Sequence, residues 1–385
     1  MNRFNCKKWR KNPGRNPLTN RPIKLYNKTF RKLSQACDKF VRCKELKGLN
    51  WTNNSCYLDS TLFALLARPN KFIDKSILYK HLKKLSKKKQ IECNTNPKID
   101  LQIRKQIQVQ LNAITHSFRQ GKNSINTCQN LRDIFAKCPK KYIDFSSGEQ
   151  QEAGEFLQYL FAIFNVNGVK TRRETFVTNS LSHNPKRLLK ISTMNNTVAD
   201  PIWFIDPFRL QTIPDNTKLK TLLTFTDDSG ELDVSNLVKR GKKKYKRRIE
   251  INQVISAPYL IFWVQRAATK FNFSYSSDSS DSPSDWGSDS SPDWGSDKED
   301  EEIVIEKPII PNQQITLPSK QVLTLSSIII HSGEVGRGHY IALIRCGRIW
   351  YSYDDMSPSV DKIGSYRQMI NHTDVTTRGG LYIYT

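Results

Sequence analysis

Long apolar runs are missing from this sequence of 385 residues. No stretch reaches about 18 consecutive apolar residues, the length that indicates a membrane-spanning helix. The first twenty residues, MNRFNCKKWRKNPGRNPLTN, are basic and lack the apolar segment of a secretory signal. We therefore expect no membrane span and a location in the cytoplasm or nucleus.

Closely spaced cysteine pairs are also missing. The eight cysteines are Cys6, Cys37, Cys43, Cys56, Cys93, Cys128, Cys138 and Cys346. No two of them form the CxxC spacing that structural zinc sites commonly use. A chain of this length does not need disulfides to stabilise its core. We therefore expect no metal and no cofactor, and we expect reduced thiols.

Positive charge is abundant, with a formal net charge of +25, but it is concentrated in two runs. Residues 1–47 contain fifteen Lys and Arg against two acids, and residues 239–248 read KRGKKKYKRR. Such runs are either solvated segments or binding sites for nucleic acid or another acidic partner. The composition leaves both interpretations open.

Acidic residues gather in one segment, 274–302, which contains ten of them against a single lysine. This segment repeats DWGSD and has too few apolar residues to offset the entropy cost of ordering. Strand-like sequences flank it at 257–265 and 315–332. We predict a basic N-terminal extension (1–46) and one domain (47–385) that the acidic insertion interrupts.

Helical patterns occupy the first half of the chain and strand patterns the second half. Apolar residues at helical spacing follow Cys56 and recur in 149–165. Alternating or β-branched runs predict strands at 257–265, 323–331, 339–345, 348–353 and 380–384. This order favours an α+β fold.

The segment GLNWTNNSCYLDS (48–60) places Cys56 in the first turn of a predicted helix, which Asn54 or Ser55 can cap. The positive end of a helix dipole lowers the pKa of a thiol. Asp59, one turn later, opposes that effect. A lone cysteine is more often a packed core residue, so a catalytic interpretation needs a base.

The segment GRGHYIALIRCGRIWYSYDD (336–355) offers that base as His339. If Cys346 and Gly347 form the turn of a hairpin, His339 lies directly opposite Asp354, close enough for a hydrogen bond. An odd loop length would instead oppose His339 to Tyr353 or Asp355, so Asp355 is the reserve partner. Cysteine, histidine and carboxylate form the arrangement used for acyl transfer, with the Cys56 N–H as oxyanion donor.

Four segments in order resemble the ubiquitin-specific protease class of deubiquitinases. They are GLNWTNNSCYLDSTLFALL, EQQEAGEFLQYLF, ISAPYLIFWVQR and HSGEVGRGHYIALIR with IWYSYDD, followed by a closing GGLYIYT. The first is most similar to cylindromatosis-type members. The resemblance implies a papain-like cysteine protease with a helical thumb that carries the cysteine at a helix N-terminus, a β-rich palm and reduced fingers.

The resemblance also implies site roles. Cys56 would be the nucleophile, His339 the general base and Asp354 its orienting carboxylate. Substrate-binding residues would be Gln151, Glu152, Gly338, Tyr340 and Trp350. Glu152 stands where the family usually has an Asp that holds the C-terminal tail of ubiquitin.

Two departures from the family pattern concern the oxyanion site and the fingers. Trp51 occupies the position where many members have an oxyanion-stabilising Asn, so Asn50, Asn53 or the backbone alone would replace it. The CxxC pairs of zinc-binding fingers are absent from 166–256. We expect shortened, metal-free fingers.

Four functions compete on this sequence. The leading one is a deubiquitinating cysteine protease whose partners are ubiquitin and ubiquitinated proteins. A protease for another ubiquitin-like modifier and a catalytically inactive ubiquitin-binding module are alternatives. A basic structural protein that binds nucleic acid is supported by charge alone.

Overall fold

The computed structural model describes residues 3–12, 14–24, 28–38, 41–84, 96–120, 128–138, 145, 148–166, 168–178, 189–197, 202–231, 238–240, 243–245, 247–269, 302–371 and 374–385. The predicted acidic insertion, apart from Glu302, lies outside the described residues. The side chains of the basic run 239–248 also lie outside the described residues. Within this run the structure describes only the backbone of 239–240, 243–245 and 247–248. No helix within these ranges is long and apolar enough to cross a membrane.

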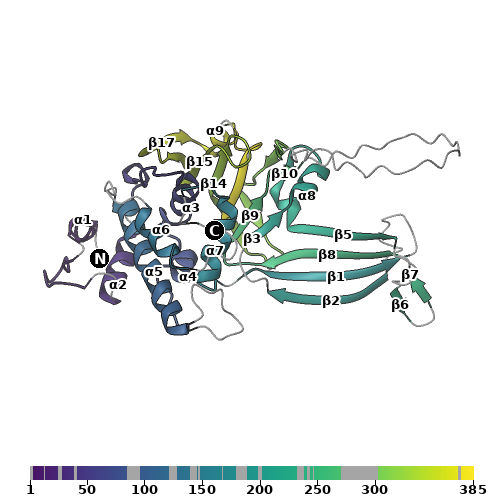
Figure 1. Cartoon of the computed structure of the whole chain (residues 1–385), viewed down its shortest axis with the longest axis horizontal. Helices are drawn as coiled ribbons and strands as arrows, with labels where there is room; N and C mark the ends of the chain where they lie inside the picture. The colour runs from purple at the N-terminus through teal and green to yellow at the C-terminus, as the bar shows by residue number, and fades with distance from the viewer. Residues whose placement is uncertain are drawn as a thin grey trace, which may run out of the picture.

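A mixed eight-stranded sheet forms the centre of the molecule (Figure 1). Its order is β17-β16-β15-β14-β18-β9-β3, and β13 pairs with β14 outside that path. Its strands are β3 (Ile202–Ile205), β9 (Leu260–Val264), β13 (Gln314–Thr316), β14 (Val322–Ser332), β15 (His339–Cys346), β16 (Ile349–Asp354), β17 (Ser357–Gly364) and β18 (Gly379–Tyr384). All five predicted strands are present within one to three residues of their expected bounds. Strands β9 and β14, on either side of the acidic insertion, belong to this one sheet.

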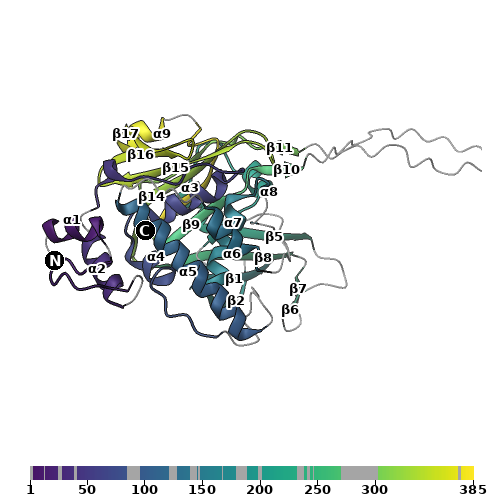
Figure 2. The same ribbon diagram turned by 60° about the vertical axis from the view of Figure 1, so that its left-hand side comes forward.

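Helices pack on one side of this sheet (Figures 1 and 2). They are α3 (Cys56–Leu66), α4 (Lys71–Ser76), α5 (Pro97–Gln120), α6 (Gln129–Phe135) and α7 (Ala153–Ile163). Their apolar residues share one core with one face of the sheet, through residues such as Phe63, Phe156 and Ala342. A second core lies around residues such as Ile328, Leu343 and Trp350. Both predicted helices are found, and the helical layer holds the end of α3 that carries Cys56.

A four-stranded sheet of order β2-β1-β8-β5 extends away from the helices (Figure 1). Its strands are β1 (Lys170–Thr178), β2 (Leu189–Thr197), β5 (Thr224–Glu231) and β8 (Arg247–Ser256). The remaining elements are β4 (Thr217–Lys218), β6 (Val238–Arg240), β7 (Lys243–Tyr245), β10 (Ala267–Thr269), β11 (Glu302–Val304), β12 (Ile309–Ile310), α8 (Pro207–Thr212) and α9 (Tyr366–Ile370), with 3-10 helices at Cys43–Glu45 and Leu219–Leu223. Antiparallel pairing of β10 with β11 joins the two ends of the acidic insertion.

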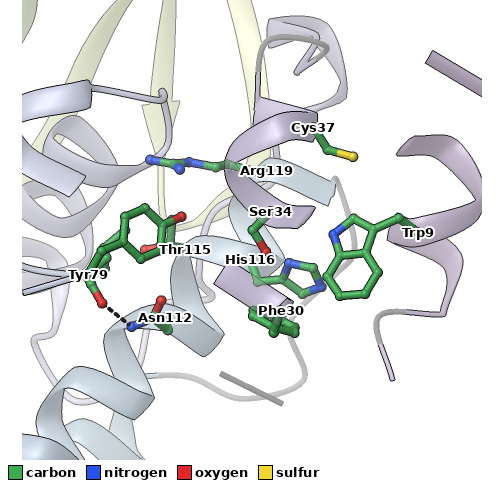
Figure 3. A pocket seen from close by; sticks show the side chains of 10 residues that line it. Trp9, Phe30, Ser34, Cys37, Tyr79, Asn112, Thr115, His116 and Arg119 are labelled. Carbon is green, nitrogen blue, oxygen red and sulfur yellow. Dashed lines mark hydrogen bonds between the residues drawn. The ribbon is translucent and has the colours of Figure 1, made fainter. Parts of the chain in front are cut away.

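The basic N-terminal segment forms a small folded module. It contains α1 (Arg3–Lys11) and α2 (Lys28–Asp38), which a disulfide between Cys6 and Cys37 connects. Trp9 and Phe30 are buried, and both rings contact the ring of His116 on α5, with centroids 6.4 and 5.5 Å apart (Figure 3). The structure therefore favours a docked module over a wholly solvated extension.

Disulfides are a difference from the sequence analysis. Besides Cys6–Cys37, a bond joins Cys43 in the first 3-10 helix to Cys346 at the end of β15, with Cα atoms 6.1 Å apart. Pairs so far apart in the numbering give no local spacing signal, which is why the sequence did not indicate them. Cys56 and Cys128 are free and buried.

Candidate active site

Cys56 is the first residue of α3. Backbone N–H groups in the first turn of a helix have no intrahelical acceptor and carry its positive dipole end. Ser55 is the N-cap residue, but its side chain makes no capping hydrogen bond. Its hydroxyl instead accepts from the N–H of Thr52 and donates to Asp59 Oδ2 at 2.5 Å. The side chain of Asn54 donates to the carbonyl of Gly148. Cys56 therefore lies at the predicted helix start. The predicted cap by Ser55 or Asn54 is wrong, because both side chains bind other groups.

Buried contacts fix α3 against the sheet that carries His339. The hydroxyl of Ser60 donates to the carbonyl of Tyr340 at 2.8 Å, and that of Ser327 donates to the carbonyl of Ala64 at 2.8 Å. The rings of Phe63 and Tyr353 stack with centroids 4.0 Å apart. Each such hydrogen bond contributes about 0.5–1.5 kcal/mol. Together they set the distance between the helix start and the start of β15.

His339 begins β15, and its Nε2 lies 2.8 Å from Asp354 Oδ1 at the end of β16. The predicted partner is correct, but the predicted register is not. Gly347 and Arg348 form the turn, with Gly347 at φ +64°, so Cys346 pairs with Ile349. This two-residue displacement keeps His339 and Asp354 on the same side of the hairpin as diagonal rather than direct neighbours. Across the strands, His339 pairs with Ser332 of β14.

The side chain of Cys56 also interacts with His339. Since Asp354 occupies Nε2, the second ring nitrogen is the one left for the sulfur. The pKa of His339 is raised to about 9, first by its interaction with the Cys56 side chain and then by Asp354 and Asp355, although burial lowers it. The ring therefore carries its proton at neutral pH.

Asp355, the predicted reserve partner, lies behind the ring of His339. Its Oδ1 is 3.5 Å from His339 Nε2, and its side chain is fully buried. It is in contact with the carboxyl of Asp59, which is also fully buried. Burial is the largest cause that raises the pKa of Asp59 well above its ordinary value, which favours the neutral form. A neutral Asp59 would not oppose a thiolate in the way that the sequence analysis expects.

The donor atoms of His339, Asp354 and Asp355 lie within 4.8 Å of one another. Histidine and carboxylates at this separation could hold a metal ion. Here their mutual hydrogen bond and ion pairs account for the cluster without one.

A cleft of about 360 Å³ is lined by Tyr340, the residue that follows His339 on β15. Its lining includes Gln151, Glu152, Gly336, Tyr340, His331 and Arg378. The hydroxyl of Tyr340 donates to Glu152 Oε2 at 3.0 Å, and the pKa of Glu152 is raised by burial. Gly338 has φ +146°, and a Cβ there would meet His331 at 2.6 Å. Four of the five predicted substrate-binding residues therefore lie in or next to this cleft.

Trp350 is the exception. Its side chain is fully buried in the second core, so the prediction that it binds substrate is wrong. Alternation along β16 explains the error, because Trp350 and Tyr353 occupy opposite faces of the sheet and contribute to different cores. Asn50 and Asn53 are exposed in the loop before Cys56, where they remain candidate oxyanion donors.

Arg132 is a residue that the sequence reasoning missed. It is buried, and its Nη1 donates to the carbonyls of Thr52 at 3.3 Å and Asn53 at 2.8 Å. Asn53 and Asn54 adopt positive φ of 46° and 54°. Arg132 thus fixes an unusual backbone just before the nucleophile. A single Arg within a short helix gives no sequence signal of such a role.

Comparison with known proteins agrees with this geometry. The ubiquitin carboxyl-terminal hydrolase family model matches residues 47–384. The chain belongs to the ubiquitin carboxyl-terminal hydrolase family. This hydrolase is therefore a deubiquitinating cysteine protease. The more specific resemblance to cylindromatosis-type members stays a prediction.

A second family model, the 2-cysteine adaptor domain, matches residues 5–39 of the hydrolase, the module bounded by the Cys6–Cys37 disulfide. No curated protein matches the hydrolase.

Solved structures share its fold. Two are SAGA DUB modules of Ubp8, Sgf11, Sus1 and Sgf73, one bound to monoubiquitin and one to ubiquitin aldehyde; each has a TM-score of 0.56 at 15% identity over 96% of this chain and 78% of the other. A yeast SAGA DUB module with an Sgf73 mutant has a TM-score of 0.53 at 14% identity over 96% and 77%. At this identity the likeness establishes the fold, an α+β papain-like protease fold.

Proposed function

We propose that the hydrolase cleaves the isopeptide or peptide bond after the C-terminal glycine of ubiquitin, with Cys56, His339 and Asp354 as its catalytic residues. The observation that carries the assignment is the position of His339, which hydrogen-bonds Asp354 at 2.8 Å and interacts with the side chain of Cys56, next to Tyr340 in the cleft lining. Cysteine, imidazole and carboxylate in this order activate a thiol for acyl transfer.

The proposed reaction begins with the Cys56 thiolate attacking the glycyl carbonyl carbon. The N–H of Cys56 stabilises the developing oxyanion, and such a donor is commonly worth about 2.7–4 kcal/mol. The His339 imidazolium then protonates the leaving amine, which departs and leaves a thioester. His339, now neutral, takes a proton from water, and the resulting hydroxide hydrolyses the thioester. Asp354 orients the ring throughout, through its 2.8 Å hydrogen bond.

The cleft supports a narrow glycine-ended tail as the substrate. Gly338 and Tyr340 leave little space beside His331, where even a Cβ on Gly338 would clash. Glu152 and Glu155 place two carboxyl groups in the lining, which suits basic residues in the tail. Two structures of the same fold hold monoubiquitin or ubiquitin aldehyde, which supports ubiquitin as the modifier.

A ubiquitin whose C-terminus carries a thiol-reactive electrophile tests this function. We expect one covalent adduct, which peptide mass spectrometry maps to Cys56, and we expect none from Cys56→Ala. His339→Ala should slow labelling by about 10²–10⁴-fold, the range typical of general acid-base catalysis. His81→Ala is the matched control, since His81 is an exposed histidine that takes part in none of these contacts.

Two alternatives give different results in the same experiment. A protease for another ubiquitin-like modifier labels with the probe of that modifier and not with the ubiquitin probe. An inactive binding module retains ubiquitin without forming an adduct. Either result, obtained with folded protein, contradicts the proposed function.

We also propose that the basic N-terminal module attracts an anionic partner such as nucleic acid. Lys7, Lys8, Arg15, Arg21 and Lys24 are exposed on it. Binding of this kind weakens steeply with salt because condensed counterions are released. Fluorescence anisotropy with labelled nucleic acid should show that slope, and Lys7→Glu with Lys8→Glu should weaken binding. Equal affinity for the variant would contradict the proposal.

We propose that the hydrolase acts in the cytoplasm or nucleus. A disulfide persists in a reducing compartment only when its reduction potential is low enough. Thiol trapping in lysed cells, followed by mass spectrometry of Cys43 and Cys346, tests whether these cysteines are paired there.

A further inference from the structure

Two buried carboxyl groups meet beneath the catalytic pair. Asp59 lies on α3, one turn after Cys56, and is 0% exposed. Asp355 follows Asp354 at the end of β16 and is 1% exposed. The two side chains lie close enough for each to shift the pKa of the other. Two ionised carboxylates at this separation, away from water, would repel strongly.

Three of the four carboxyl oxygens of this pair have no hydrogen-bond partner. Asp59 Oδ2 accepts from Ser55, but Asp59 Oδ1 has no protein partner, and neither does either carboxyl oxygen of Asp355 by hydrogen-bond geometry. Unsatisfied buried oxygens cost free energy. A proton on Asp59 Oδ1, donated to Asp355, would satisfy one oxygen of each residue.

We propose that Asp59 and Asp355 share one proton, held on Asp59, and that Asp59 is a positioning residue that keeps the ionised Asp355 directed at His339. The inference rests on the proposed function, because it concerns the histidine of that reaction. It describes a continuous series of hydrogen bonds from the Thr52 N–H through the Ser55 hydroxyl and Asp59 to Asp355. The ion pair of Asp355 with His339 at 3.5 Å completes it.

The groups around the pair agree with a single negative charge. Ser55 and Tyr57 face it from α3, Cys128 from the start of α6, and Tyr353 and Asp354 from β16. The tyrosines and Cys128 stay neutral, because burial raises the pKa of each. His339 supplies the positive charge from β15, and Arg132 acts on Tyr57 and Cys128 from α6.

The two carboxyl groups differ in a way that places the proton. Burial raises the pKa of Asp59 well above its ordinary value. Burial also raises the pKa of Asp355, but only to about 6, since His339 and the hydrogen bond from Asp59 lower it. At neutral pH Asp59 is therefore the donor and Asp355 the carboxylate. Asp355 should lose its charge as the pH falls through about 6.

Two substitutions separate this arrangement from a simple ionised Asp59. In Asp59→Asn the amide oxygen accepts from Ser55 and the amide N–H donates to Asp355, as the protonated acid does. We expect kcat/KM for a fluorogenic ubiquitin amide within about threefold of the wild-type value. Asp59→Leu has no donor, and misplacement of the histidine partner should lower kcat/KM by about 10- to 100-fold.

The pH profile gives a readout that a purely structural role would leave unmoved. Loss of the donor raises the pKa of Asp355, so the acid limb of kcat/KM should move to higher pH in Asp59→Leu and stay in place in Asp59→Asn. Equal loss of activity in both variants, or an unmoved limb in Asp59→Leu, overturns the proposal.

Infrared spectroscopy covers the case in which Asp59→Leu does not fold. The wild type at neutral pH should show the carbonyl band of a buried carboxylic acid that Asp59→Asn removes, and absence of that band overturns the proposal. An inactive wild-type enzyme contradicts the proposed function instead, so the two failures are distinguishable.

Discussion

At the scale of single residues, the protonation of His339 decides when the enzyme can work. Its pKa of about 9 exceeds the ordinary value of 6.5, so the imidazolium is present below 6.5 and is lost as the pH rises through about 9. Since the proposed leaving amine takes its proton from this ring, kcat/KM should fall on the alkaline side near pH 9. A stopped-flow pH series with the ubiquitin amide measures it. An alkaline limb near the ordinary histidine value would contradict the assignment.

Asp354 and Asp355 are unequal partners of that histidine. Asp354 hydrogen-bonds it at 2.8 Å, whereas Asp355 lies at 3.5 Å. We expect Asp354→Ala to lower kcat by about 10²-fold, because His339 loses its orienting bond. The double variant with Asp355→Ala should lose more than the single one, since the remaining ion pair goes too. If the double variant equals Asp354→Ala in kcat, Asp355 has no role in the reaction.

Sequence reasoning at this scale worked where chemistry restricts the choice of residue. A thiol at a helix start needs a base, and the hairpin of β15 and β16 contains a histidine and a carboxylate whose side chains lie on the same face. The predicted His339–Asp354 pairing held although the predicted register was wrong, because a shift of two residues keeps side chains on the same face. Asp59 and Arg132 were missed or misjudged, because their roles depend on burial by elements distant in the sequence.

At the scale of elements, helix α5 supports the end of α3. Arg119 on α5 forms a buried ion pair with Asp74 of α4 at 2.8 Å and donates to the carbonyls of Leu66 and Arg68. Arg119→Met leaves Asp74 buried without its cation. The free energy of unfolding in urea should fall by about 3–5 kcal/mol.

A paired replacement is the control for this prediction. Arg119→Met with Asp74→Leu removes both charges, so it should cost less than Arg119→Met alone. An equal or larger loss would indicate that the carbonyl contacts of Arg119, and not its charge pairing, stabilise this corner.

Helix α5 also shows why element prediction was incomplete. Ile103, Ile107, Leu111, Ile114 and Phe118 are buried at helical spacing. A second buried stripe is polar and consists of Asp100, Arg104, Gln108, Asn112, Thr115 and Arg119. The apolar residues of α5 have helical spacing, but the polar residues that also face inward make this periodicity harder to recognise in the sequence. The amides of Gln108 and Asn112 bind carbonyls of the segment after α4, contacts that no sequence period reveals.

At the scale of the whole molecule, the Cys43–Cys346 disulfide joins residues separated by 303 positions. Closing so long a loop restricts the unfolded chain, and a disulfide typically contributes about 2–4 kcal/mol. Cys43→Ser with Cys346→Ser should lower the thermal midpoint under oxidising conditions. The shorter Cys6–Cys37 pair, separated by 31 residues, is the matched comparison and should matter less. Identical midpoints for all variants would contradict a stabilising role.

The overall architecture was predictable in its class and in the central sheet, since apolar strands and a helix-start cysteine are local signals. The four-stranded sheet of order β2-β1-β8-β5 was not, because polar residues alternate along its strands and give weak periodicity. The docking of the N-terminal module could not be predicted from the sequence either. It depends on contacts of Trp9 and Phe30 with His116, a residue far from both in the sequence, as Figure 3 shows.

The central claim is that Cys56 and His339 cooperate in hydrolysing the bond after the last glycine of ubiquitin. The most direct measurement is turnover of isopeptide-linked diubiquitin by the wild type, Cys56→Ala and His339→Ala, with His81→Ala as control. We predict free ubiquitin from the wild type and the control alone. Cleavage by folded Cys56→Ala, or none by the folded wild type, would contradict the account.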